Sequence, residues 1–157
     1  MFARTHADLH NVRLGVERIR TVSDRLIGLG PFGIGLDGIL SFFPVLGVIY
    51  SGGAALMLLA EAIRARASTW TLAHMGLLLF VDTALDIPGS AGLGILSGAA
   101  DTLFTGHKWS ANLLLRHMDD TLYIEGSRAQ ARGSPEYAEL MADVRARREK
   151  RRIVFLG

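Results

Sequence analysis

The sequence LIGLGPFGIGLDGILSFFPVLGVIYSGGAALMLLAEAI, residues 26–63, decides the expected fold. It contains no Lys or Arg, and its only charged residues are Asp37 and Glu61. A second apolar stretch, residues 67–107, also lacks Lys and Arg, and its three charged residues are all Asp. Each basic side chain costs about 3 kcal/mol near the centre of a bilayer. Because the chain keeps Lys and Arg out of two long apolar stretches, we expect a membrane protein.

Composition limits the class of protein. The 157 residues fit one domain, half of them are hydrophobic, and the net charge is +2. The absence of Cys excludes disulfides and thiolate chemistry. The polar start, residues 1–11, lacks the apolar segment of a secretory signal. Arg-rich ends without interleaved aromatic residues favour anionic lipid over nucleic acid as a partner. The alternative to a membrane protein is a helical core wholly buried within a soluble domain.

Pro and Gly divide each apolar stretch in two. The breaks are Pro44–Gly47 and Pro88–Gly92, because Pro lacks the backbone donor that a helix needs and Gly permits a turn. A helical arm of about 18 residues extends about 27 Å, just short of the usual hydrocarbon thickness of about 30 Å. The sequence predicts all-α structure in which four arms pair as two hairpins, either spanning or re-entrant: residues 26–43 with 45–63, and residues 70–87 with 91–107.

The positions of the Arg residues favour hairpins over single spans. If each stretch enters and returns, the N-terminal part, the link at Arg64–Arg66 and the C-terminal part share one side, as the positive-inside rule requires. Two single spans would carry the link to the opposite side. Leu36-Asp37 precedes the first break and Val81-Asp82 precedes the second, which suggests an internal repeat with one hairpin per copy.

Residues 6–26 have the spacing of an amphipathic helix. Apolar residues recur every three or four positions, and the Arg residues lie largely on the other side. Such a helix either packs as a solvated helix on the rest of the fold or lies in the membrane interface. We expect three segments: an amphipathic N-terminal helix at 1–27, a membrane domain of two hairpins at 28–117, and a basic C-terminal segment at 118–157.

Glycine is dense in the apolar arms. Small residues let helix backbones approach closely in lipid. Gly94 and Gly98 form a GxxxG match, and Gly52 and Gly53 are adjacent in the first stretch. We expect these four residues to pack helices, either within the chain or against another subunit.

The C-terminal segment has a helix start followed by basic residues. Ser134 before Pro135 is a good start, because Ser caps a helix and Pro fits its first turn. The basic residues form either a solvated tail or a site for anionic lipid head groups, where each contributes about 1 kcal/mol. The candidate head-group ligands are Arg145, Arg147, Arg148, Lys150, Arg151 and Arg152.

Polar residues inside the apolar arms form a candidate polar site. Ionisable groups in a membrane are costly and often mark ion or proton paths. Asp82 and Asp86 are four apart, so they share a helix face on which mutual repulsion would raise a pKa. The simpler interpretation is that each Asp caps a helix at a break or pairs with a basic residue. The candidate residues are Asp37, Asp82, Asp86, Asp101, Lys108 and Asn112.

The sequence predicts neither metal binding nor catalysis. His6 and His10 have a ligand spacing on a helix but no third ligand nearby. No G-x-S-x-G motif is present. The glycines of residues 28–33 follow no predicted strand, as a dinucleotide site would require. We therefore expect no catalytic residue, no metal and no cofactor.

Several different short motifs follow one another along the chain. They are Gly35-Leu36-Asp37, Phe43-Pro44-Val45-Leu46-Gly47, Glu61-Ala62-Ile63-Arg64, Val81-Asp82, Ile87-Pro88, and Asp101, Phe104, Lys108 and Asn112. In this order they resemble a bacterial membrane family catalogued as domain of unknown function 4112, from about Arg20 to His117. The resemblance implies a small helical protein of the bacterial cytoplasmic (inner) membrane, and the Arg positions put both termini in the cytoplasm. It implies no activity.

The expected function is non-catalytic. We expect a small integral membrane protein that serves as a structural or accessory subunit and packs against a larger membrane complex or against itself. The expected partners are anionic lipid head groups and another membrane protein or a second copy, and not nucleic acid. The alternative is a small unit that conducts ions or protons through its intramembrane Asp residues.

Overall fold

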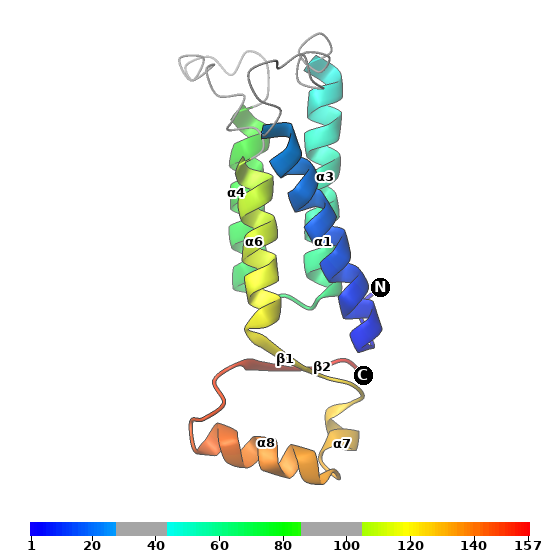
Figure 1. The fold of residues 1–157 in the computed structure, drawn as a ribbon, viewed down its shortest axis with the longest axis vertical. Coiled ribbons are helices and arrows are strands. Elements are labelled where there is room, and N and C mark those ends of the chain that lie inside the picture. Colours follow the sequence, from blue (N-terminus) through cyan, green and yellow to red (C-terminus); the bar gives the residue numbers. More distant parts are fainter. Residues whose placement is uncertain (28–43, 86–104) are drawn as a thin grey trace.

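The computed structural model describes residues 1–27, 44–85 and 105–157. Within these ranges the chain forms helices and two short strands (Figure 1). The elements are α1 (His6–Ile27), α3 (Pro44–Arg64), α4 (Thr69–Leu85), α6 (Thr105–Asp119), β1 (Thr121–Ile124), α7 (Arg128–Ala131), α8 (Pro135–Arg145) and β2 (Arg152–Phe155).

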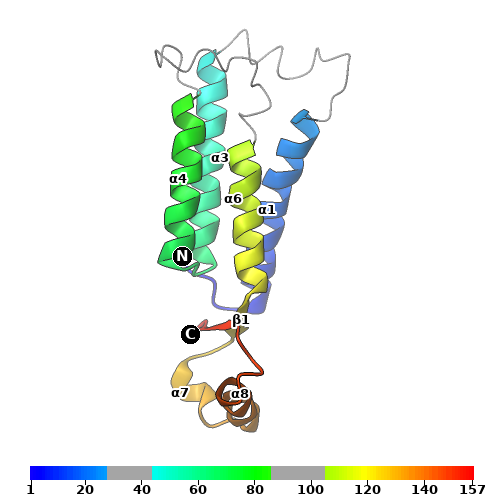
Figure 2. The ribbon, with the colours of Figure 1, turned by 90° about the vertical axis from the view of Figure 1, so that its left-hand side faces the viewer.

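The four long helices run alternately up and down and form a bundle of two layers (Figures 1 and 2). α1 and α6 lie side by side in one layer, and α3 and α4 form the other. α1 also packs on α3, and α6 packs on α4. Residues 121–157, here named the C-terminal cap, comprise β1, α7, α8 and β2 and lie beyond one end of the bundle.

Each long helix buries one apolar stripe in the centre of the bundle. In α1, Val12 and Val16 are one turn apart and both are fully buried. Burial of such a side chain stabilises the fold by about 2 kcal/mol. The buried residues of the stripes are Leu9, Val12 and Val16; Ala55, Leu58 and Ala62; Met75 and Leu79; and Ala111, Leu114, Leu115 and Met118.

α1 begins with a reciprocal cap. The backbone N–H of Asp8 donates to Thr5 Oγ1 (3.1 Å), and the Asp8 carboxylate accepts from the N–H groups of Arg4 (2.9 Å) and Thr5 (3.1 Å). These bonds, the one from Arg4 first, hold the pKa of Asp8 below its usual value. The amphipathic helix predicted over residues 6–26 is confirmed, and it packs on the rest of the fold, which was the first of its two alternatives.

The two middle helices begin and end close to the predicted arms. α3 starts at Pro44, where the first break is predicted, and α4 corresponds to the arm 70–87. Ser68 starts α4, since its Oγ accepts from the N–H of Thr71 (3.1 Å). The arm 26–43 and most of the arm 91–107 lie outside the described residues.

The turn between α3 and α4 lies at the same end of the bundle as both chain termini. The N–H of Ala3 donates to the carbonyl of Arg64 (2.9 Å), and Arg66 donates to carbonyls of the C-terminal cap. The positions of the Arg residues led us to expect these three segments on one side of a membrane; the structure instead groups them at one end of a helix bundle. In the described part of the chain, α1 and α4 are both antiparallel neighbours of α3.

The C-terminal cap contains the only strands among the described residues. β1 and β2 pair in parallel, with Tyr123 opposite Val154. The all-α prediction did not include them. The predicted start of α8 is confirmed, because Ser134 Oγ accepts from the N–H of Tyr137 (3.2 Å) and Pro135 begins the helix. The short α7 lies between β1 and α8.

The prediction of an all-α membrane protein is wrong. Among the described residues, no helix combines the length and the apolar content that crossing a bilayer requires. The same finding overturns the expected transmembrane helices and the expected location in a bacterial inner membrane. The physical reason lies in the packing: the apolar stripes of α3 and α4 are covered by α1 and α6. With 17 residues, α4 extends only about 26 Å.

We predict that Leu114→Ala lowers the free energy of unfolding by about 2–5 kcal/mol, because this fully buried side chain would leave a cavity. Leu14→Ala removes the same atoms from α1 at a position that is 37% exposed, and should cost about 1 kcal/mol or less. Urea denaturation followed by circular dichroism measures both losses. Equal losses would contradict this placement of the core.

Candidate functional site

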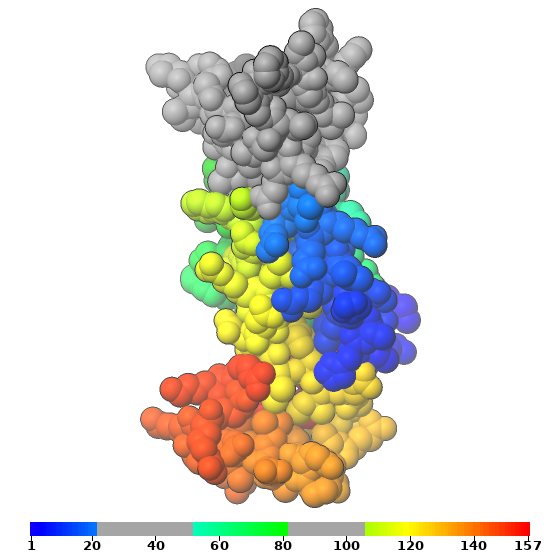
Figure 3. Space-filling model, viewed as in Figure 1, coloured from blue at the N-terminus to red at the C-terminus, as the bar shows by residue number. Residues whose placement is uncertain are grey.

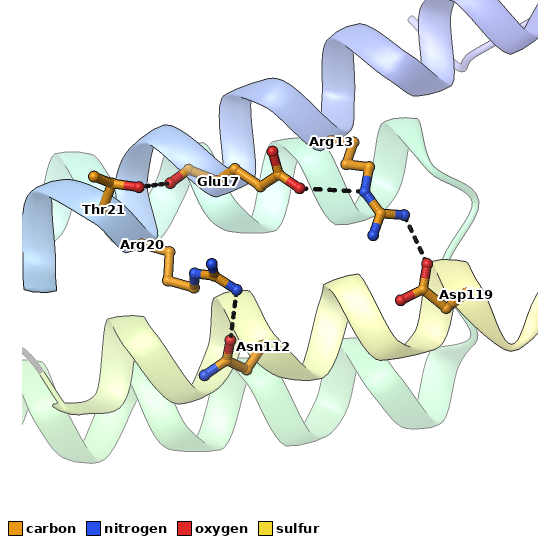
Figure 4. Close-up of polar contacts among 6 residues, drawn as sticks. All are labelled: Arg13, Glu17, Arg20, Thr21, Asn112 and Asp119. Carbon is orange, nitrogen blue, oxygen red and sulfur yellow. Dashed lines mark hydrogen bonds and ion pairs between the residues drawn. The ribbon is translucent and has the colours of Figure 1, made fainter.

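Polar side chains join α1 to α6 along their shared layer (Figure 4). Arg13 donates to Asp119 on α6 (2.6 Å) and to Glu17 on its own helix (3.2 Å). The Asp119 carboxylate, followed by Glu17, raises the pKa of Arg13. Further along, Arg20 donates to Asn112 Oδ1 (3.4 Å). Ion pairs this exposed contribute about 1 kcal/mol or less, so these contacts align two helices and offer no reactive group.

The described residues do not bring the candidate polar site together. Asp37, Asp86 and Asp101 lie outside them, and Asp82 belongs to the last turn of α4. Lys108 is partly buried in α6. Asn112 accepts the hydrogen bond from Arg20 of α1 that is described above. An ion or proton path through these residues stays a prediction.

Two of the four glycines predicted to pack helices lie among the described residues, and two do not. Gly94 and Gly98 lie outside the described residues. A Cβ added to Gly52 or Gly53 would meet no atom within 4 Å in the part of the chain that the structure describes. Neither residue marks a close approach of two helices there. Contact of these glycines with another subunit stays a prediction.

Three of the six predicted head-group ligands have partners within the protein. Arg148 pairs with Asp143 (3.1 Å), and Arg151 pairs with Glu149 (2.6 Å). The Arg151 side chain, aided by its backbone N–H, lowers the pKa of Glu149 to about 2. Arg152 contacts the end of the bundle. The other three are exposed: Arg145, Arg147 and Lys150.

The outward sides of α3 and α4 form an uncharged surface, here named the outer face. Leu56, Trp70 and Phe80 are each more than 70% exposed on it. Its residues follow helical spacing on both helices. They are Gly53, Leu56, Met57, Ala60 and Ile63 of α3, and Trp70, Ala73, His74, Leu77, Phe80 and Val81 of α4.

The opposite side of the bundle has a different character. Figure 3 shows α1 and α6 covering the near side, with α3 and α4 visible only at its edges. The exposed or partly exposed residues of that side include Arg13, Glu17, Arg116 and Asp119. The charged and uncharged surfaces thus belong to different helix layers. A contiguous exposed apolar surface such as the outer face commonly marks an interaction site.

At the end of the bundle, Arg66 joins the α3–α4 turn to the C-terminal cap. Its guanidinium donates to the carbonyls of Phe155 (2.7 Å) and Leu156 (2.8 Å). In return, Arg152 donates to the carbonyl of Arg66 (2.9 Å). Tyr123 of β1 donates to the carbonyl of Ala65 (2.9 Å), and burial raises the pKa of its hydroxyl. These side chains supply donors to carbonyl groups of a turn and of a strand end.

His117, near the end of α6, contacts both sides of this junction. Its ring nitrogens lie close to the N–H of Ser68 (3.3 Å), to Thr71 Oγ1 (3.1 Å) and to Arg152 Nη1 (3.2 Å). Burial, followed by the charge of Arg152, lowers its pKa, and Asp120 acts in the opposite direction. A single imidazole thus connects α6, the start of α4 and β2.

Comparison with known proteins identifies the family. Residues 13–118 match the family model described as Domain of unknown function (DUF4112). The chain belongs to this family. The match covers α1, α3, α4 and α6 from Arg13 onward, and ends just before the C-terminal cap. No curated protein and no solved structure matches the chain.

The stretch Glu61-Ala62-Ile63-Arg64 has a structural role in this protein. Glu61 is only 7% exposed and accepts from Arg64 at 2.8 and 3.0 Å. A Cβ added to Gly15 of α1 would lie 3.4 Å from Glu61 Oε1, so α1 passes close to this pair. Within the described ranges of this DUF4112 protein, no group of three or more His, Cys, Asp or Glu could hold a metal ion.

Sequence reasoning missed the junction around Arg66 and His117. Its partners are far apart in the chain, since Ser68 lies 49 residues and Arg152 lies 35 residues from His117. The one local signal is Ser68 with Thr71, a spacing that favours a helix start. That signal predicts the beginning of α4, but it does not indicate which histidine contacts Ser68 and Thr71.

We predict opposite effects for two replacements at positive φ. Arg66 (φ 53°) and Arg147 (φ 56°) both adopt a conformation that Gly tolerates better. Arg66→Gly should still lower the free energy of unfolding by about 1–3 kcal/mol, because two carbonyls lose a charged donor. Arg147→Gly should be neutral or stabilising by about 1 kcal/mol. Urea denaturation compares the two, and an equally neutral Arg66→Gly would contradict the role of the junction.

Proposed function

We propose that this DUF4112 protein is a non-catalytic structural subunit that assembles through its outer face. The observation that carries the proposal is the uncharged surface of α3 and α4. Leu56, Trp70 and Phe80 leave most of their surface in contact with solvent. Covering apolar surface contributes about 25 cal/mol per Å², so association through this face would be favourable.

The polar residue on the outer face has one of its two ring nitrogens bonded within its own helix. His74 Nδ1 lies 2.9 Å from the carbonyl of Trp70, and the two rings pack edge to face with centroids 4.3 Å apart. A histidine bonded in this way can enter an interface at a lower desolvation cost than one whose ring nitrogens depend on water. Its position therefore does not oppose burial of the face.

A second copy of the chain is the occupant that this face favours. An isologous dimer brings one surface against itself about a two-fold axis. A charged surface would meet like charges in that arrangement, whereas the outer face presents none. The small residues Gly53, Ala60 and Ala73 alternate with large ones along both helices, so protruding side chains of one copy can fit between those of the other.

The size of the outer face sets the strength of a dimer. From the rise per residue, the residues of the face extend about 17 Å along the helices, and the usual spacing of packed helices gives a width of about 20 Å. Two copies would bury about 700 Å², which is below the size of standard specific interfaces. A weak dimer is therefore expected, with dissociation at low protein concentration.

We predict that the purified chain sediments as a dimer of twice 17.0 kDa at about 100 µM. Leu77→Glu should give the monomer, because it places a carboxylate on the outer face of both copies. Leu14→Glu adds the same charge to an exposed position of α1 and should leave the dimer intact. Circular dichroism verifies the fold of each variant. A monomeric wild type, or stable binding of a different protein at this face in place of a second copy, would refute the proposal.

The absence of Cys from the chain allows a second test of the same face. Leu77→Cys places one thiol on the outer face, and Leu14→Cys places one on α1. Mild oxidation should link the first variant into a covalent dimer well before the second. Equal rates of cross-linking would show only random collision and would contradict the proposed interface.

A further inference from the structure

The hydrogen bonds around His117 fix which of its ring nitrogens carries the proton. Nε2 faces the backbone N–H of Ser68 (3.3 Å) and Nη1 of Arg152 (3.2 Å). Both groups can only donate, so Nε2 must be the unprotonated acceptor. The proton of the neutral ring is therefore on Nδ1, which donates to Thr71 Oγ1 (3.1 Å). The Thr71 hydroxyl can in turn donate to Ser68 Oγ (2.8 Å).

Protonation would reverse this arrangement at Nε2. The new N–H would point at two donors and could bond to neither. One of these donors carries a full positive charge, and the other lies at the start of α4, where the helix dipole is also positive. The imidazolium would thus be repelled from both the bundle side and the cap side of the junction.

The other charged and titratable groups near His117 do not offset this repulsion. Arg116 precedes it on α6, Arg66 lies in the α3–α4 turn, and Tyr123 comes from β1. On α4, residues 69–72 carry no charge. Asp120, which follows α6, favours the imidazolium, but burial and the neighbouring Arg152 outweigh it.

We propose that His117 is a pH-sensitive latch that holds the C-terminal cap on the bundle when neutral and loosens β2 when protonated. Arg152 is the first residue of β2, and its side chain also donates to the carbonyl of Arg66. Repulsion from an imidazolium displaces this guanidinium and removes its hydrogen bond to the turn, so that, of its bonds to the turn, β2 keeps only those that Arg66 donates to its C-terminal end. The latch is independent of assembly through the outer face.

The direction of the pH dependence follows from linkage. The pKa of His117 in the folded protein lies below the value near 6.5 that it has in the unfolded chain. Above about pH 6.5 both states are neutral, and the contribution of the latch is fully present. As the pH falls from about 6.5 through the folded-state pKa, the unfolded chain binds the proton first, and this stability is lost.

Amide hydrogen exchange tests the latch on the full chain. The N–H groups of Arg152 and Leu156 donate to the carbonyls of Asp120 (3.2 Å) and Ile124 (2.9 Å), so they report on the position of β2. Between pH 7.5 and pH 5.5 their protection factors, corrected for the intrinsic rate, should fall by up to about tenfold, which is the limit for one proton bound with a pKa near 6.5 in the opened state. Unchanged protection would overturn the proposal.

Two histidine variants assign the effect. His117→Gln retains an acceptor near Ser68 and Arg152 but does not titrate, so it should abolish the pH dependence at β2. His74→Gln removes a histidine that bonds only within α4, and the pH dependence should remain. A pH response that persists in His117→Gln would refute the latch.

A measurement on the unaltered chain covers the case in which His117→Gln does not fold. Long-range ¹H–¹⁵N correlation spectra distinguish the two neutral tautomers of histidine. They should show the proton of His117 on Nδ1 and its titration below the ordinary histidine value near 6.5. A proton on Nε2, or titration above about pH 6.5, would overturn the proposal.

Discussion

The whole structure depends on the burial of one apolar stripe from each of four helices. Val16, Leu58, Met75 and Leu114 come from four different helices, and all are fully buried in one core. Each such side chain contributes about 2 kcal/mol, whereas an exposed ion pair between α1 and α6 contributes about 1 kcal/mol or less. Helix packing therefore sets the positions of the helix ends, and the polar contacts at those ends follow from it.

The junction at the end of the bundle shows how this dependence works. The turn at Arg66, which has a positive φ, and the end of β2 both present carbonyls that accept from side chains. The bundle places them close enough for two arginines to serve both: Arg66 reaches the carbonyls of β2, and Arg152 reaches the carbonyl of Arg66. Because His117 shares the guanidinium of Arg152, its protonation state is coupled to the attachment of the cap.

Local signals predicted local structure well. Pro44 and Ser134-Pro135 gave helix starts that the structure has, and the spacing of apolar residues gave α1. The strands could not be predicted in the same way, since each has four residues and its partner lies about 30 residues away in the chain. The junction was missed for a related reason: the spacing of neighbouring residues carries no information on which distant side chain meets a turn.

The membrane prediction failed at a different step. The scarcity of charge along α3 and α4 predicts apolar neighbours on both of their sides, but the hydrophobic effect has no direction and does not identify those neighbours. That information lies in the other two long helices. Because α1 and α6 pair apolar stripes with charged outer sides such as those of Glu17 and Arg116, they are suited to cover one side of an apolar helix pair. The inner side of α3 and α4 is thereby covered within the chain. The outer side, with Trp70 and Phe80 exposed, is the part for which we propose a second copy as the cover.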